Sequence, residues 1–255
     1  MNIPNKFDPN NYQFNKESRD GVYIIHGFTN TTYEVKELAI YLSEKGFYTR
    51  ADNLPGHGFT PEDCNRCQYQ DWIEFVEQGI AEMSSRCDNI YIIGISMGSV
   101  LALHTCSNFP LNAAVFASTV LEFKARFDVR ILTPLFHRLH PFTLKKKLYP
   151  KEVQDTIEFF GYDVWPLTAL NEMRKLTNKV RKVLPTIKCP ALIIHSEADL
   201  LSLPSNISLV YDTITSENKE KLIVKKSFHN LFASNPDQEI IFKNIVEFFN
   251  RFREK

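Results

Sequence analysis

Short, largely apolar runs, separated by segments with helical periodicity, constrain this chain more than any other feature of its sequence. Five clear runs occupy residues 21–26, 90–93, 113–117, 191–194 and 222–224, and a weaker one occupies residues 47–51. The segments between them that place apolar residues at helical spacing include residues 34–45, 71–83, 99–105 and 240–252. Strands that are apolar on both faces and alternate with helices are typical of a parallel sheet covered on both sides. The sequence therefore predicts an α/β fold.

One long stretch, residues 121–184, interrupts this alternation. It has helical patterns and several prolines but no clear strand pattern, and it lies between two predicted strands of the sheet. Connections longer than about 15 residues that lack secondary structure are uncommon. We therefore expect an α/β core of residues 1–120 and 185–255, with an inserted helical cap at residues 121–184.

The predicted cap is rich in aromatic residues and contains a cluster of lysines. We expect a minority of the aromatic side chains to line a pocket and the rest to pack the cap onto the core; they are Phe123, Phe127, Phe136, Phe142, Phe159, Phe160 and Trp165. Phe127 and Phe136 are our candidates for the pocket. Lys145-Lys146-Lys147 is expected to be a solvated charge run, which is the ordinary role of such a cluster.

Charge and cysteine content argue against several classes of protein. Lys plus Arg is 30 and Asp plus Glu is 30, so the chain lacks the basic excess of a typical nucleic-acid binder. The five cysteines include Cys64 and Cys67 at metal-ligand spacing, but no second ligand pair follows, and we expect no metal site. We predict reduced thiols in a cytoplasmic protein, with neither a secretory signal nor a transmembrane segment. The oligomeric state stays open.

The sharpest chemical signal is the motif Gly94-Ile95-Ser96-Met97-Gly98. It follows the predicted strand at 90–93 directly and opens into a predicted helix, which is the setting that a nucleophile elbow requires. A chance match to this pattern is rare in a chain with nine glycines. Ser96 is therefore the predicted nucleophile.

A serine hydroxyl needs a base to activate it, and the base needs a carboxylate to orient it. His229 follows the predicted strand at 222–224, at the edge of the sheet where parallel strands end and where such folds place their sites. Glu197 and Asp199 both follow the strand at 191–194, and we favour Asp199 because it lies further past the strand end. The order Ser96, Asp199, His229 is the order that the nucleophile-elbow enzymes use.

The oxyanion of an acyl-transfer intermediate needs backbone donors. One is expected from the N–H of Met97, which follows the nucleophile. The second is expected from Phe28, because Gly27 allows the chain to turn after the first strong strand.

These segments, together with Pro55-Gly56-His57-Gly58, resemble the α/β-hydrolase superfamily, in particular its bacterial carboxylesterase and monoacylglycerol lipase branch. The resemblance covers nearly the whole chain. It implies an α/β-hydrolase fold with a mostly parallel sheet, helices on both faces and an inserted helical cap. It also implies the hydrolysis of short- to medium-chain esters through an acyl-enzyme, without a cofactor, and it is compatible with peripheral lipid contact through the cap.

The sequence departs from this branch at two positions. Ser99 stands where many relatives have glycine, and Ser202 stands where an aliphatic residue is common. Both departures leave the substrate open. A thioesterase or acyltransferase with the same triad is one alternative, and a non-catalytic hydrolase-fold protein that binds a small ligand is another.

Overall fold

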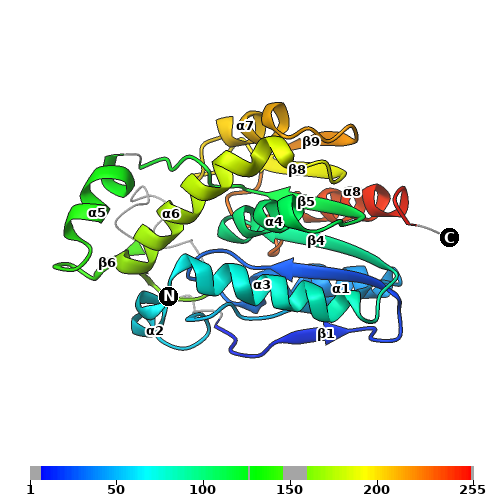
Figure 1. Cartoon of the computed structure of the whole chain (residues 1–255), viewed down its shortest axis with the longest axis horizontal. Coiled ribbons are helices and arrows are strands. Elements are labelled where there is room, and N and C mark those ends of the chain that lie inside the picture. Colours follow the sequence, from blue (N-terminus) through cyan, green and yellow to red (C-terminus); the bar gives the residue numbers. More distant parts are fainter. Residues whose placement is uncertain (1–6, 126, 146–159, 254–255) are drawn as a thin grey trace.

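A central sheet organises the computed structural model, which describes residues 7–125, 127–145 and 160–253 (Figure 1). The sheet has seven strands in the order β1-β3-β2-β4-β5-β8-β9. Their bounds are β1 Tyr12–Phe14, β2 Asp20–Ile25, β3 Tyr48–Ala51, β4 Asn89–Ile95, β5 Ala113–Ala117, β8 Ala191–Ser196 and β9 Lys219–Val224. Every neighbouring pair is parallel except β1 and β3, which are antiparallel.

The central strands explain the apolar runs of the sequence. β4 and β5 are buried along their whole length, because helices cover both faces of the sheet at their positions. A strand in that environment has no solvated face and therefore shows no alternation of apolar and polar residues. The parallel α/β architecture predicted from those runs is confirmed.

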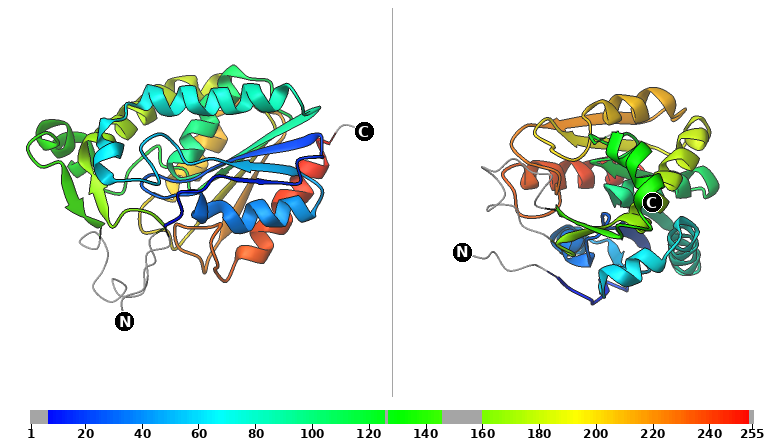
Figure 2. Two further views of the ribbon diagram at one scale, coloured as in Figure 1. Left: turned by 90° about the horizontal axis from the view of Figure 1, so that it is seen from below. Right: turned by 90° about the vertical axis from the view of Figure 1, so that its left-hand side faces the viewer.

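Two layers of helices enclose the sheet (Figure 2, left). α1 (Lys36–Glu44) and α8 (Gln238–Asn250) pack on one face, where Leu38 and Ile245 join a buried cluster with Ile93 of β4. The helices that pack on the opposite face are α2 (Pro61–Arg66), α3 (Tyr69–Ser84), α4 (Met97–Asn108), α6 (Leu167–Val183) and α7 (Ser205–Thr213). No helix in the described parts of the chain is long and apolar enough to cross a bilayer.

The edge strand β1 was not predicted from the sequence. It has only three residues, and its Tyr12 pairs with Ala51 of β3. A strand of that length is too short to show a periodicity of two, and its pairing depends on a partner almost 40 residues away in the chain.

The inserted segment lies at the left of Figure 1 and mixes short helices with short strands. The helical segment η2 (Asp128–Leu132) runs into α5 (Thr133–Phe136), and β6 (Phe142–Leu144) pairs antiparallel with β7 (Val164–Pro166). The expectation of a purely helical insertion is therefore incomplete, because this two-stranded sheet is part of it. Strands of three residues leave no pattern in the sequence that would reveal them.

α6 joins the inserted segment to the core. Its first turns follow β7, and its later residues Leu176 and Val180 are fully buried in the same apolar cluster as α3 and α4. The insertion is thus fixed to the core through the packing of the 17-residue helix α6.

Candidate active site

Ser96 lies in a tight turn between β4 and α4, with φ 57° and ψ −116°. The chain can make this turn only with glycine on either side. A β-carbon at position 94 would lie 2.1 Å from the carbonyl oxygen of Gly98, and one at position 98 would lie 2.3 Å from that of Ile25. Both obstacles are backbone atoms that cannot rotate away. The strand–turn–helix setting inferred from the sequence is present, with the serine held in a conformation that L-residues rarely adopt.

Three of the predicted site residues form one continuous chain of hydrogen bonds. Ser96 Oγ is 2.9 Å from His229 Nε2, and His229 Nδ1 is 2.7 Å from Asp199 Oδ2. All three side chains are buried. Glu197, the alternative carboxylate, is exposed to solvent and is not part of this chain of bonds.

Asp199 is itself held by the backbone of the loop that follows it. Its Oδ1 accepts the N–H groups of Leu201 at 2.8 Å and Ser202 at 2.9 Å. The carboxylate therefore has one oxygen committed to the loop and the other directed at the imidazole.

Burial and charge have opposite effects on the pKa values of His229 and Asp199. Burial disfavours protonation of His229, but the charge of Asp199 and its hydrogen bond outweigh that effect and raise the pKa of the imidazole above its ordinary value. Burial likewise raises the pKa of Asp199, but the imidazole and the two backbone donors outweigh it and lower the pKa of the carboxyl group. Asp199 therefore stays ionised beside His229, and the His229 imidazole readily accepts a proton.

The loop after β2 lies against the nucleophile. A β-carbon on Gly27 would be 3.2 Å from the Ser96 β-carbon. Within the described residues, the N–H groups of Phe28 and Met97 have no hydrogen-bond acceptor. Two free donors next to a serine hydroxyl are what an oxyanion hole requires.

Ser99 and Ser202, the two positions at which the sequence departs from the carboxylesterase and lipase branch, both form hydrogen bonds with Thr119. Ser99 Oγ lies 2.6 Å from Thr119 Oγ1, and Ser202 Oγ donates to the Thr119 carbonyl oxygen at 2.6 Å. The adjacent Ser118 Oγ donates to the carbonyl oxygen of His229 at 2.9 Å. These hydroxyls tie the elbow helix and the loops of Asp199 and His229 to the segment after β5.

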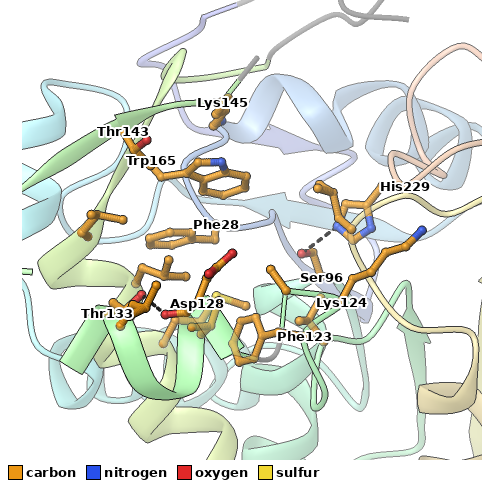
Figure 3. A pocket seen from close by; sticks show the side chains of 18 of the residues that line it. Phe28, Ser96, Phe123, Lys124, Asp128, Thr133, Thr143, Lys145, Trp165 and His229 are labelled. Carbon is orange, nitrogen blue, oxygen red and sulfur yellow. Dashed lines mark hydrogen bonds between the residues drawn. The ribbon is translucent and has the colours of Figure 1, made fainter. Parts of the chain in front are cut away.

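A cavity of about 620 Å³ opens at Ser96 and His229 (Figure 3). Its apolar wall includes Phe28, Val120, Phe123, Val129, Leu132, Phe136, Trp165, Leu167, Leu170, Met173, Leu200 and Leu201. Most of this wall comes from the inserted segment, including the first turns of α6. A volume of this size fits a small organic ligand.

Among the aromatic residues of the insertion, Phe123, Phe136 and Trp165 line the cavity. The Trp165 ring stacks on Phe28, with centroids 5.9 Å apart. Phe127, one of our two candidates, is 65% exposed and does not line the cavity, so that choice was wrong. Phe159 lies outside the described residues.

The expectation for the lysine cluster is wrong for Lys145. This side chain is buried on the cavity wall, with its Nζ 5.0 Å from the Trp165 ring centroid (Figure 3). Burial lowers its pKa to about 7, although the charges of Glu34 and Asp163 oppose the change. A run of three lysines gives no sign in the sequence that one of them folds inward. Lys146 and Lys147 lie outside the described residues.

Glu34 was not singled out from the sequence. It is completely buried, and its two oxygens accept the N–H of Gly27 at 2.6 Å and the Nδ2–H of Asn30 at 2.7 Å. A glutamate near the start of a predicted helix has an ordinary explanation in the helix dipole, so nothing in the sequence sets it apart.

The cysteine pair considered as a metal site does not belong to a group of three possible metal ligands within the described residues. Cys64 is buried and Cys67 is half-buried, and in the described part of the chain no three His, Cys, Asp or Glu side chains form a group that could hold a metal ion. His57 Nε2 lies 4.0 Å from the Cys64 sulfur.

The arrangement has clear relatives. The sequence profile of the serine aminopeptidase S33 family of hydrolases matches residues 16–236. The chain belongs to this family. This S33 hydrolase is a serine hydrolase with the α/β-hydrolase fold.

Individual relatives are similar over almost their full length. The S33 hydrolase is 29% identical over 243 residues to a thermostable monoacylglycerol lipase of Bacillus sp. (strain H-257). The match covers 90% of this chain and 90% of the lipase. It is 22% identical over 231 residues to a carboxylesterase of Bacillus subtilis (strain 168), covering 90% of this chain and 92% of that one. Among solved structures, one of a metagenome-derived lipolytic enzyme, described with LipS and LipT, matches with a TM-score of 0.83 at 24% identity. That match covers 98% of this chain and all of the other, and it shows the shared fold.

Proposed function

We propose that this S33 hydrolase cleaves carboxylic esters with short to medium acyl chains through an acyl-enzyme. The observation that supports this most directly is the hydrogen-bonded series Asp199–His229–Ser96, which opens onto an apolar cavity of about 620 Å³. The named activities of the lipase and carboxylesterase relatives agree with an ester as substrate.

In the proposed mechanism, Ser96 Oγ attacks the carbonyl carbon of the ester while His229 Nε2 takes the hydroxyl proton. Asp199 holds the Nδ1–H of the imidazole and stabilises the cation that forms. The N–H groups of Phe28 and Met97 bind the oxyanion. When the intermediate collapses, the ester C–O bond breaks and His229 returns its proton to the leaving alcohol. A water molecule then repeats the sequence on the acyl-enzyme and releases the acid.

Residues 121–184 act as the cap in this proposal, with α6 fixing it to the core. The side chains that it contributes, among them Leu132, Phe136 and Trp165, form an apolar roof over the nucleophile. Each methylene that such a cavity removes from water contributes about 0.8 kcal/mol to binding. The length of the cavity would therefore set the preferred acyl chain.

The outer surface of the cap supports a further part of the proposal, contact with lipid aggregates. In the described part of the insertion, seven large apolar side chains are exposed: Phe127, Ile131, Leu132, Leu135, Phe136, Leu139 and Leu144. Two of them, Leu132 and Phe136, also line the cavity, so the apolar surface continues from the outside to the site. Exposed apolar clusters of this kind mark membrane or protein contacts.

Vesicle sedimentation tests the lipid contact. The wild-type protein should sediment with phosphatidylcholine vesicles, and Leu135→Asp with Leu139→Asp should release it. Ile240→Asp is the matched control, because Ile240 is a half-exposed apolar residue on α8, away from the cap. If the double variant sediments as the wild type does, the lipid contact is to be abandoned.

A cytoplasmic location is also part of the proposal. Its support is that all five cysteines are free thiols, as is usual in a reducing compartment.

A substrate panel tests the proposed reaction. Hydrolysis of p-nitrophenyl esters from acetate to palmitate should be measured beside an acyl-CoA thioester and an aminoacyl p-nitroanilide. We expect kcat/KM to be highest for an oxygen ester of short or medium chain. If the thioester or the anilide were the better substrate by tenfold or more, the enzyme would be a thioesterase or an aminopeptidase.

A further inference from the structure

A fully buried carboxylate lies directly behind the proposed oxyanion loop. Glu34 belongs to the short helix η1 (Thr32–Val35), which begins where that loop ends. Burying a charge is costly unless polar groups compensate it, so a carboxylate at this place needs an explanation beyond packing.

The carboxylate holds both ends of the turn that presents Phe28. One oxygen accepts the N–H of Gly27 at 2.6 Å, and the other accepts the side-chain amide of Asn30 at 2.7 Å. The backbone of the turn is closed by a bond from the N–H of Asn30 to the carbonyl oxygen of Gly27, at 3.2 Å. Thr29 within the turn has φ 64°, a conformation that needs support from its surroundings. Glu34 therefore fixes the peptide next to the Phe28 N–H.

The same carboxylate lies close to the nucleophile. A β-carbon on Gly27 would be 3.1 Å from Glu34 Oε2 and 3.2 Å from the Ser96 β-carbon, so only the glycine backbone separates the two residues. Both carboxylate oxygens accept hydrogen bonds, as those of an ionised group do. Burial raises the pKa of Glu34, whereas its two donors and the charges of His229 and Lys145 oppose the increase.

Two ionisable groups act on the His229 imidazole, and a third, His195, lies against Asp199. Asp199 has the strongest favourable effect, and the charge of Glu34 adds to it in raising the pKa of His229. His195 of β8 lies with its Nε2 3.8 Å from Asp199 Oδ2, and burial lowers its pKa, which keeps it neutral. Glu34 is thus a second negative charge that favours the imidazolium form.

We propose that Glu34 is a positioning residue of the reaction: it holds the Phe28 N–H toward the oxyanion, and its negative charge stabilises the protonated His229 that forms during attack. This inference rests on the proposed roles of Ser96, His229 and Phe28.

The test uses the rate at which a fluorophosphonate labels Ser96, because this reaction needs an activated serine but no particular ester. Ser96 Oγ bonds to phosphorus, fluoride leaves, and His229 takes the proton. The second-order labelling rate is measured from pH 5 to 9 for the wild type, Glu34→Gln, Glu34→Ala and Glu44→Gln. Glu44 is the matched control, since it is an exposed glutamate on the neighbouring helix α1. Ester kcat and KM are measured in parallel.

The two Glu34 variants separate charge from positioning. Glutamine keeps the size of the side chain and an oxygen for the Gly27 N–H. Its amide nitrogen replaces the oxygen that accepts from Asn30, and the Asn30 amide can turn to present its own oxygen, so the main effect is loss of charge. We expect the acidic limb of the Glu34→Gln profile to move down by roughly half a pH unit. Alanine also releases the loop, and we expect a labelling rate and an ester kcat at least tenfold lower with little change in KM, since a small misplacement of a catalytic group costs about that much or more.

Lys145 needs its own control because it titrates near neutrality and faces Glu34. In a Lys145→Met background, Glu34→Gln should still shift the acidic limb if that limb belongs to His229. A shift that disappears in this background would overturn the part of the inference that concerns charge.

The outcomes distinguish this inference from the proposed function. If Ser96 is labelled but no ester is hydrolysed, the ester substrate is wrong and the labelling rates still decide the role of Glu34. If both Glu34 variants keep the wild-type rate and profile, the inference about Glu34 is wrong and the proposed function stands. If Glu34→Ala only lowers the melting temperature and Glu34→Gln shifts no limb, the residue has a structural role alone. If Ser96 is not labelled in the wild type, both proposals fail.

Discussion

Replacing Asp199 by asparagine should trap His229 in the wrong tautomer. The side chain keeps its shape, but one of its two oxygens becomes an amide nitrogen that donates hydrogen bonds. The environment decides which position the nitrogen takes. At the Oδ1 position, two buried backbone donors, from Leu201 and Ser202, lie 2.8 and 2.9 Å away.

An amide nitrogen at the Oδ1 position would face both donors and leave them unsatisfied, at about 1–3 kcal/mol each. The asparagine oxygen should therefore stay there, and its nitrogen should face His229 Nδ1. That nitrogen of the ring must then accept a hydrogen bond, so the imidazole proton moves to Nε2. Since Nε2 lies 2.9 Å from Ser96 Oγ, a proton on it prevents His229 from taking the hydroxyl proton.

We expect kcat of Asp199→Asn to fall by about 10⁴, which corresponds to about 5.5 kcal/mol of activation free energy. The assay is steady-state hydrolysis of p-nitrophenyl butyrate, with circular dichroism to show that the variant is folded. Glu197→Gln is the control, because Glu197 is exposed and follows the same strand. A kcat within tenfold of the wild type for Asp199→Asn, or a larger loss for Glu197→Gln, would refute this reasoning.

Three further outcomes follow from the geometry. Ser96→Gly should abolish turnover yet raise the free energy of unfolding by about 1 kcal/mol in chemical denaturation, because glycine adopts φ 57° without strain; residual turnover above 1% would contradict the role of Ser96. The kcat/KM profile should lose activity as pH falls through a pKa above about 6.5, since His229 must be neutral to act and its pKa is raised; a limb below pH 6 would be inconsistent. Phe136→Ala should move the preferred acyl chain to longer esters, because Phe136 lines the cavity, whereas Phe127→Ala should not; equal profiles for both variants would show that this wall does not limit chain length.

Local sequence was enough to predict the framework of the molecule. The run at 113–117 coincides with β5, and the run at 90–93 lies within β4. The turn at Ser96 could be recognised because its requirements are met by adjacent residues: two glycines and a strand that leads into a helix. Asp199 and His229 were chosen because each follows a predicted strand, and parallel strands bring their carboxyl ends to one edge of the sheet.

Tertiary structure decided what local sequence left open. Lys145 is buried because β6 and β7 fold it against Trp165, and Glu34 lies behind the nucleophile because the loop after β2 turns back on itself. Neither residue differs in its sequence context from an exposed lysine or an ordinary helix-start glutamate. Likewise, Phe136 lines the cavity whereas Phe127, nine residues earlier, faces solvent. Burial and partner choice depend on segments that are distant in the chain, and the pattern of neighbours along the sequence contains little information about them.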